Sequence, residues 1–218
     1  MKIKQKDIAI LFTGKILKQF KKKIIGAKIG KVSSMPKSVN SELAFIVADR
    51  DVSNKELKNL LKTFKTICAI SNQKYTLLNS ISSSYIVNNT YTKIVYLVLR
   101  QIIECFSKPS LVNLSLNEII EFFKKNKEVS ISYQKYCLTD ENRNKQITNS
   151  HIEHLKSTNI LILIKCGSNI QLEDITELGD TLLKNVSETA AVFWTCDATG
   201  KEKNRVEVVV VADRKIRK

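Results

Sequence analysis

Glycine and proline are scarce in this sequence, which has six glycines and two prolines among 218 residues. That scarcity argues against a loop-rich or repetitive protein. The glycines are also scattered, so no segment has the glycine-rich composition that lets a backbone approach phosphate groups closely. Hydrophobic residues make up 43% of the chain, which is enough for a packed core in one large domain or two small ones.

Cysteine pairs with metal-binding or redox spacing are also missing. The five cysteines are widely spaced, form no C-x-x-C motif and lie mostly in apolar runs: Cys68, Cys105, Cys137, Cys166 and Cys196. We therefore expect reduced thiols that behave as small hydrophobic core residues, as in a cytosolic protein. Two histidines, His151 and His154, could share a helix face, but no third ligand lies near them, so no metal site is expected.

Acidic residues are too few to balance the basic ones, and the net charge is +15. A basic surface can bind nucleic acid or anionic lipid. However, the aromatic residues are not interleaved with the charges and no known nucleic-acid motif is present, so we expect no nucleic-acid partner. No signal peptide is expected, because the first hydrophobic run, Ile8–Phe12, is too short to be one. The apolar stretch Asn89–Phe106 contains three charged residues, which excludes a membrane span.

The hydrophobic patterns that are present predict strands alternating with helices, which indicates an α/β protein with a parallel sheet in its first part. Predicted strands are Ile8–Phe12, Leu43–Ala48, Thr66–Ile70, Val129–Leu138, Ile160–Ile164, Ala190–Trp194 and Val206–Val211. Predicted helices are Lys15–Ile25, Asn54–Phe64, Asn89–Phe106, Leu116–Lys125, Ser150–Leu155 and Leu172–Val186. Loops or turns are expected at Gly26–Asn40, Tyr75–Ile86 (with a short helix), Thr139–Thr148 and Asp197–Asn204.

The rest of the chain is organised around residues 87–121. Asn89–Phe106 is apolar on nearly every side at helical spacing, which predicts a buried helix. Pro109 ends this helix because proline cannot continue the hydrogen-bond ladder. Ser115 and Glu118 then form an S-x-x-E capping box, which predicts the start of the next helix. In the buried helix we expect four side chains to lie in the core: Leu97, Leu99, Ile102 and Phe106.

The order of elements from Ile160 to Lys215 resembles the C-terminal domain of FtsZ, the tubulin-like division protein of bacteria and archaea. Residues 87–119 align without gaps with the central helix and following loop of that family. The segment PSLVNLSLNE at 109–118 resembles the loop P-G-L-I-N-x-D-x-x-D, and ISNQK at 70–74 resembles I-P-N-D-K. The resemblance covers roughly Leu43–Lys215.

This resemblance implies an α/β fold made of a partial tubulin-type nucleotide domain, a central buried helix and a smaller C-terminal α/β domain. Residues 1–86 would be the residual half of a tubulin/FtsZ-like GTPase domain. Residues 87–108 would form the central helix, and residues 109–218 would form the FtsZ-like C-terminal domain.

The family's nucleotide contacts are not matched. Its phosphate-binding G-G-G-T-G-T-G segment has no counterpart, and its guanine-binding aspartate falls at Lys93. We therefore expect no cofactor, and the family resemblance is the only reason to consider GTP as a ligand.

The family's two catalytic aspartates fall at Ser115 and Glu118, so Glu118 is the one catalytic candidate. The capping box explains both residues without catalysis and is the favoured interpretation. Asn113 could equally well orient a phosphate or stabilise a turn. The resemblance assigns the subunit-interface loop to Ser110, Leu111, Asn113, Leu114, Ser115 and Asn117, with Asn113 and Leu114 expected to be exposed.

The implied function is that of an FtsZ-like cell-division protein acting by filament association at a septum, with degenerate or absent GTP binding. Its partner would be a complete FtsZ-like protein or itself, in the cytoplasm or in the stroma or matrix of an organelle. The chain ends at Lys218, just past the last strand, so no direct membrane anchor is expected. Whether it is an enzyme stays open. One alternative is an active FtsZ-type GTPase with unrecognised nucleotide contacts, and another is a basic α/β module that binds nucleic acid or anionic lipid.

Overall fold

The computed structural model describes residues 8–13, 27–34, 41–71, 73, 75–81, 84–87, 91–107, 111–140, 143–167, 169–200 and 202–214. The strands in these ranges are β1 (Ile8–Phe12), β2 (Lys28–Lys31), β3 (Ser41–Ala48), β4 (Phe64–Ser71), β5 (Ser84–Val87), β6 (Glu128–Cys137), β7 (Asn159–Gly167), β8 (Ala191–Gly200) and β9 (Arg205–Asp213). The α-helices are α1 (Asn54–Thr63), α2 (Thr76–Ile81), α3 (Tyr91–Ser107), α4 (Leu116–Lys125), α5 (Arg143–Leu155) and α6 (Leu172–Leu183). The predicted helix Lys15–Ile25 lies outside the described residues.

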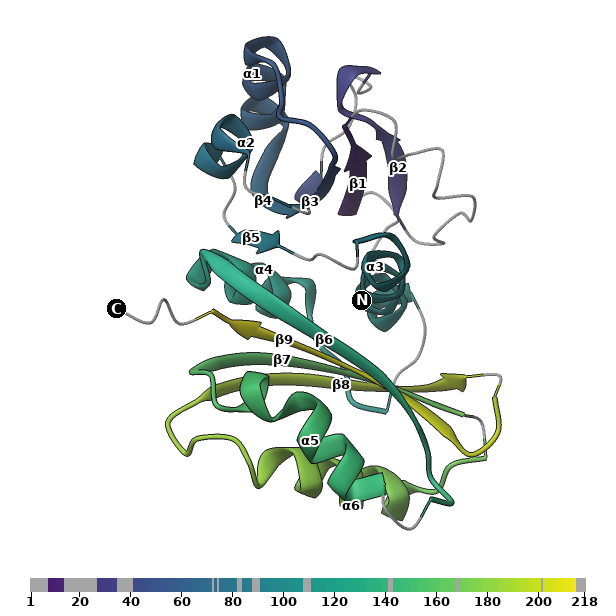
Figure 1. Cartoon of the computed structure of the whole chain (residues 1–218). Helices are drawn as coiled ribbons and strands as arrows, with labels where there is room; N and C mark the ends of the chain where they lie inside the picture. Colours follow the sequence, from purple (N-terminus) through teal and green to yellow (C-terminus); the bar gives the residue numbers. More distant parts are fainter. Residues whose placement is uncertain are drawn as a thin grey trace.

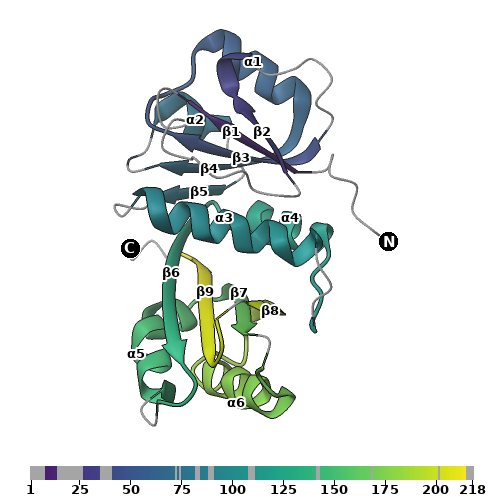
Figure 2. The same ribbon diagram turned by 90° about the vertical axis from the view of Figure 1, so that its right-hand side faces the viewer.

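The strands form one sheet in the order β2-β1-β3-β4-β5-β6-β9-β7-β8. Pairing is parallel from β2 to β6, antiparallel on both sides of β9, and parallel between β7 and β8. Among the described residues, strand pairing between the two halves consists of two residue pairs in β5 and β6, Tyr85 with Glu128 and Ile86 with Val129. Figures 1 and 2 show an upper half with β1–β5 and a lower half with β6–β9, with α3 and α4 lying between them.

Helices cover both outer faces and fill the middle of the molecule. α1 and α2 pack on the outer face of the upper strands, and α5 and α6 pack on the outer face of the lower strands. A third core cluster joins α3 and α4 to strands of both halves. Its aromatic rings make the link: Phe123 of α4 lies 5.5 Å from Phe45 of β3, and Phe122 lies 6.0 Å from Phe193 of β8. The two halves therefore share one hydrophobic core.

The central helix α3 is buried as predicted. Leu99 and Ile102 are fully buried, whereas Leu97 is only partly buried. The side chain of Phe106 is outside the described residues. The narrow polar stripe of the helix faces charges of the lower sheet: Arg100 bonds to Glu207 of β9 at 3.4 Å. Along the same stripe, the Glu104 carboxylate accepts a hydrogen bond from the Lys165 ammonium of β7, which pins α3 to the lower sheet.

Four predicted loops contain regular structure instead. Residues 26–40 include β2 and a 3-10 turn at Val32–Ser34, and residues 75–86 include β5 as well as the expected helix α2. Helix α5 starts within the predicted turn Thr139–Thr148, and β8 continues to Gly200 through the predicted turn Asp197–Asn204. β2, β5 and the end of β8 are held by pairing with neighbouring strands, which a short polar sequence does not reveal.

All five cysteines are free thiols, as expected, and four of them are buried. Cys137 is the exception: it is exposed at the end of β6, so the expectation of a core position is wrong for this residue. None of the helices within the described ranges combines the length and apolar content that a membrane crossing requires.

Candidate functional site

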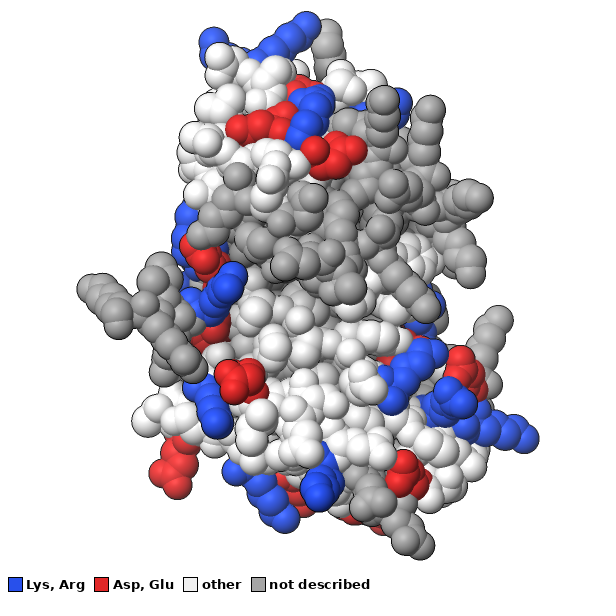
Figure 3. Space-filling model, viewed as in Figure 1, with Lys and Arg blue, Asp and Glu red and all other residues white. Residues whose placement is uncertain are grey.

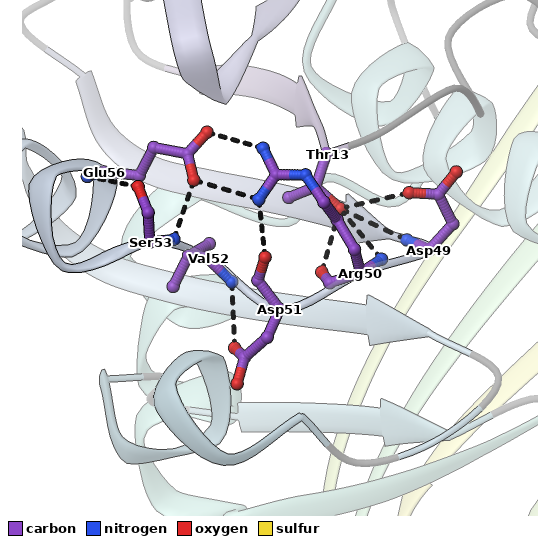
Figure 4. A network of polar contacts seen from close by, with 7 residues as sticks. All are labelled: Thr13, Asp49, Arg50, Asp51, Val52, Ser53 and Glu56. Carbon is purple, nitrogen blue, oxygen red and sulfur yellow. Dashed lines mark hydrogen bonds and ion pairs between the residues drawn. The ribbon is translucent and has the colours of Figure 1, made fainter.

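The first candidate site lies at the carboxyl ends of β1 and β3. β1 pairs with β2 on one side and with β3 on the other, so the order of strands reverses direction there. In open α/β sheets, ligands bind at the carboxyl ends of the strands beside such a switch point. Thr13 follows β1 and residues 49–53 follow β3, so these residues occupy the switch point (Figure 4).

The Thr13 side chain fixes the start of the loop after β3. Its hydroxyl accepts hydrogen bonds from the backbone N–H groups of Asp49 and Arg50, at 3.2 and 3.4 Å. The same hydroxyl donates to the Arg50 carbonyl oxygen at 3.1 Å. Thr13 is 1% exposed, so these backbone groups are satisfied by a buried side chain of the same chain.

An ion pair then closes the N-terminus of α1. The Arg50 guanidinium contacts the Glu56 carboxylate at 2.7 and 3.0 Å. Glu56 also accepts the N–H of Ser53 at 2.8 Å, and the Ser53 hydroxyl accepts the N–H of Glu56 at 3.3 Å, which completes a capping box. The hydrogen bond from Arg50 holds the pKa of the Glu56 carboxyl below its usual value, with further bonds from Ser53 acting in the same direction.

A second carboxylate occupies the N-terminus of α2. Asp51 accepts the backbone N–H groups of Leu77 and Leu78, each at 2.9 Å, and that of Val52 at 2.9 Å. Free N–H groups at a helix N-terminus are the usual site for a phosphate. Here the N-termini of α1 and α2 are both occupied by carboxylates of the chain, and these carboxylates also repel anions. Among the described residues, this edge of the sheet therefore does not form a phosphate cradle.

The sequence pointed to only part of this network. Ser53 and Glu56 form a second S-x-x-E motif, which is visible in the sequence. Nothing local indicates that Thr13 reaches residues 49 and 50, because that contact depends on the pairing of β1 with β3. Of the segment 70–74 that resembles I-P-N-D-K, the structure describes Ile70, Ser71 and Gln73; the side chain of Lys93 is also outside the described residues.

The second candidate site is the loop between α3 and α4. The Leu111 N–H donates to the Cys196 carbonyl oxygen at 2.9 Å. The Val112 carbonyl oxygen accepts the Cys196 N–H at 3.4 Å and the Thr195 hydroxyl at 2.6 Å. The loop is thus attached as a short antiparallel bridge to β8, the last strand of the sheet.

Ser115 and Glu118 form the predicted capping box at the start of α4. The Ser115 N–H and hydroxyl both donate to the Glu118 carboxylate at 2.7 Å, and the Glu118 N–H donates to the Ser115 hydroxyl at 3.2 Å. The Ser115 hydroxyl is the main cause of a lowered pKa at Glu118. The one catalytic candidate is therefore an ionised carboxylate already bonded to its own helix end, which suits a cap better than a catalyst.

The structure places most of the predicted interface residues at the surface. Leu111 is 56% exposed, and Asn113, Ser115 and Asn117 are exposed as well. Leu114 is different, because it is 7% exposed and belongs to the shared core. The expectation that Leu114 is exposed is therefore wrong: its apolar side chain packs under the loop. Ser110 lies outside the described residues.

We also considered a metal site and a nucleic-acid interface in the part of the chain that the structure describes. No group of three or more histidine, cysteine, aspartate and glutamate side chains there could hold a metal ion. On the face drawn in Figure 3, the described basic and acidic side chains are interspersed and separated by uncharged ones. That face does not show the continuous basic stripe typical of a nucleic-acid interface.

Comparisons with known proteins identify the fold. No protein-family model matches the sequence, and no curated protein sequence matches it. An empty FtsZ dimer from M. jannaschii matches with a TM-score of 0.70 and 13% identity over 94% of this chain and 87% of that chain. A point mutant of the same FtsZ matches with a TM-score of 0.69 and 14% identity over 95% and 91%. A GTPgS-bound protofilament of CetZ2 from Haloferax volcanii matches with a TM-score of 0.53 and 10% identity over 81% and 66%. The chain therefore has the α/β fold seen in FtsZ and CetZ, and the resemblance to FtsZ is confirmed at the level of fold.

Proposed function

Because the chain has the fold of FtsZ and CetZ, we propose that it is an FtsZ-like cell-division protein that associates with filaments without hydrolysing GTP. Its partner is a complete FtsZ-like protein, and it works in the cytoplasm or in the stroma or matrix of an organelle. FtsZ and CetZ2 among the structural neighbours were solved as a dimer and a protofilament, which supports association between subunits of this fold.

The observation that carries the proposal is the network at the switch point. Arg50, Glu56 and Ser53 satisfy the N-terminus of α1, and Asp51 satisfies that of α2. A nucleotide phosphate placed there would have to break these bonds and sit beside carboxylates. These existing hydrogen bonds, together with the absence of a glycine-rich loop, support the proposed loss of GTP binding.

The opposite end retains an ordered loop. Residues 111–118 are anchored on β8 and capped at α4, with Leu111 and Asn113 at the surface. A head-to-tail polymer grows only if each subunit offers two complementary faces. A chain with one competent face binds the end of a filament and blocks further growth. We therefore expect capping of filaments rather than elongation by this protein.

GTP binding tests the first half of the proposal. Calorimetric titration of the purified chain with GTP and magnesium should give no saturable binding with a dissociation constant of about 1 μM, equivalent to about −8 kcal/mol. A complete FtsZ from the same source, titrated identically, serves as the positive control. A saturable micromolar site on this chain would contradict the proposal and favour an active GTPase.

Sedimentation of filaments tests the second half. Complete FtsZ from the same source is pelleted with GTP, alone and with an equimolar amount of this chain, which should reduce the pelleted fraction. Replacing exposed Leu111 and Asn113 by glutamate should remove this effect without unfolding the protein, because neither side chain is in the core. Ile29→Glu, a change of the same kind on β2, is the matched control and should retain the effect. Unchanged pelleting with the wild-type chain, or long polymers of this chain alone that depend on GTP, would refute capping.

A further inference from the structure

Helix α6 has an uncharged stripe on its outer surface that the rest of the described chain does not cover. Leu172 is 65% exposed and Leu183 is 42% exposed. At 100° per residue, Thr176, Gly179 and Leu183 lie within about 40° of Leu172 on the helix surface. A methyl group at Gly179 would meet no atom within 4 Å, so the fold of this chain gives no steric reason for a glycine there. Glycine disfavours a helix relative to alanine, so its presence here favours a partner molecule that approaches α6 closely.

The same helix is acidic in a strongly basic protein. α6 carries Glu173, Asp174, Glu177 and Asp180 and no basic residue, whereas the whole chain has a net charge of +15. Asp174 is bonded to the Gln171 N–H at the helix start, and Glu177 accepts the Asn144 amide. Glu173 and Asp180 are exposed along the edge of the leucine stripe.

A pocket in the upper half has the complementary character. It is a half-open depression of about 610 Å³ between the last turn of α1, the starts of β3 and β4, and the first residue of α4. Leu61, which is 56% exposed, and Leu116 supply its apolar lining. Lys62, Lys65 and Glu42 line it as well, so the lining carries one excess positive charge. Lys65 forms an exposed ion pair with Glu42 at 3.4 Å and keeps 77% of its side chain accessible to a partner.

We propose that α6 of one copy of this chain docks into the α1–α4 pocket of a second copy. Leu172 enters the pocket against Leu61, while Glu173 and Asp180 lie beside Lys62 and Lys65. Two copies with a charge of +15 repel each other in general, so a contact between them needs a local match of acidic and basic surface. The chain supplies both surfaces, each with an exposed leucine among its charges. This inference does not rest on the proposed function, because the contact uses neither GTP nor a complete FtsZ.

Sedimentation velocity over a concentration series tests this contact. Each copy offers one α6 and one pocket, so the contact joins copies head to tail. At low salt the wild-type chain should therefore form oligomers that grow with concentration, and about 1 M salt should weaken them, because the Debye length falls to about 3 Å. Leu172→Lys should weaken self-association at least about tenfold, as expected for a buried anchor residue. Ile29→Lys makes the same chemical change at an exposed site on β2 and should leave self-association unchanged.

Charge reversal identifies the pairing of the two surfaces. Glu173→Lys and Lys62→Glu should each weaken self-association about two- to fivefold, as rim ion pairs do, and the double variant should regain the wild-type value. Gly179→Ala should raise the melting temperature and weaken self-association, because the added methyl group helps the helix but crowds the partner. A strict monomer at low salt overturns the proposal. So does self-association that Leu172→Lys leaves intact, or a double variant that is no better than the single ones.

Discussion

His151 should make the lower half of the protein sensitive to acid. The residue lies on α5 and is 0% exposed, with its Nδ1 2.6 Å from the Ser132 hydroxyl oxygen of β6 and its ring centre 6.0 Å from that of Tyr136. Its Nε2 is buried and has no hydrogen-bond partner among the described residues. Burial lowers the pKa of His151 from 6.5 to about 4, and the neighbouring His154 acts in the same direction.

The sign and size of the effect follow from linkage. Folded His151 stays neutral until the pH approaches 4, whereas in the unfolded chain it takes up a proton near pH 6.5. As the pH falls between these values, the unfolded state binds the proton and the folded state does not. Stability is therefore lost as the pH falls from about 6.5 to 4, and the pKa difference converts to about 3 kcal/mol at the lower end.

Urea unfolding at pH 7 and pH 4 measures this loss, with His151→Phe as the comparison. Phenylalanine keeps an aromatic ring beside Tyr136 and cannot bind a proton. It leaves the Ser132 hydroxyl without this contact at both pH values, so that cost cancels in the comparison. Carboxylates with a lowered pKa, such as Glu56 and Glu118, contribute stability that is also lost in acid. This loss is the same in both proteins. The wild-type free energy of unfolding should fall by about 3 kcal/mol more than that of the variant. Equal pH dependence of the two proteins would refute the reasoning.

Two further predictions concern the core and the thiols. Leu99→Ala should lower the free energy of unfolding by about 2–5 kcal/mol, because it leaves a cavity in the core shared by both halves. Leu97→Ala, at a partly buried position of the same helix, should cost clearly less, and equal losses in urea titration would contradict the assigned burial. Cys137 is exposed, and its hydrogen bond with Thr139 lowers the pKa of its thiol. A thiol reagent should therefore modify Cys137 rapidly in the folded protein and the other four cysteines only after unfolding; rapid reaction of a second thiol would contradict their burial.

The amino-acid sequence alone was enough to predict much of the local structure and, through its resemblance to FtsZ, the overall fold. The capping box at Ser115 and Glu118 is legible because its hydrogen bonds close within four residues. The burial of α3 is legible because apolar residues surround the helix at a spacing set by the helix itself. The runs that became β1, β3 and β7 are apolar almost throughout, as strands covered on both faces are.

Tertiary structure decided the features that depend on which segments become neighbours. β2 forms because its residues pair with β1. β8 extends to Gly200 because it pairs with β7 as far as Gly167. Cys196 holds Val112 although the two residues are far apart in the chain, and Thr13 organises the loop at Asp49 in the same way. Each of these hydrogen bonds uses at least one backbone group, and every residue carries such groups, so residue type alone does not predict the contacts. The closure of the switch point is therefore visible only in the folded chain.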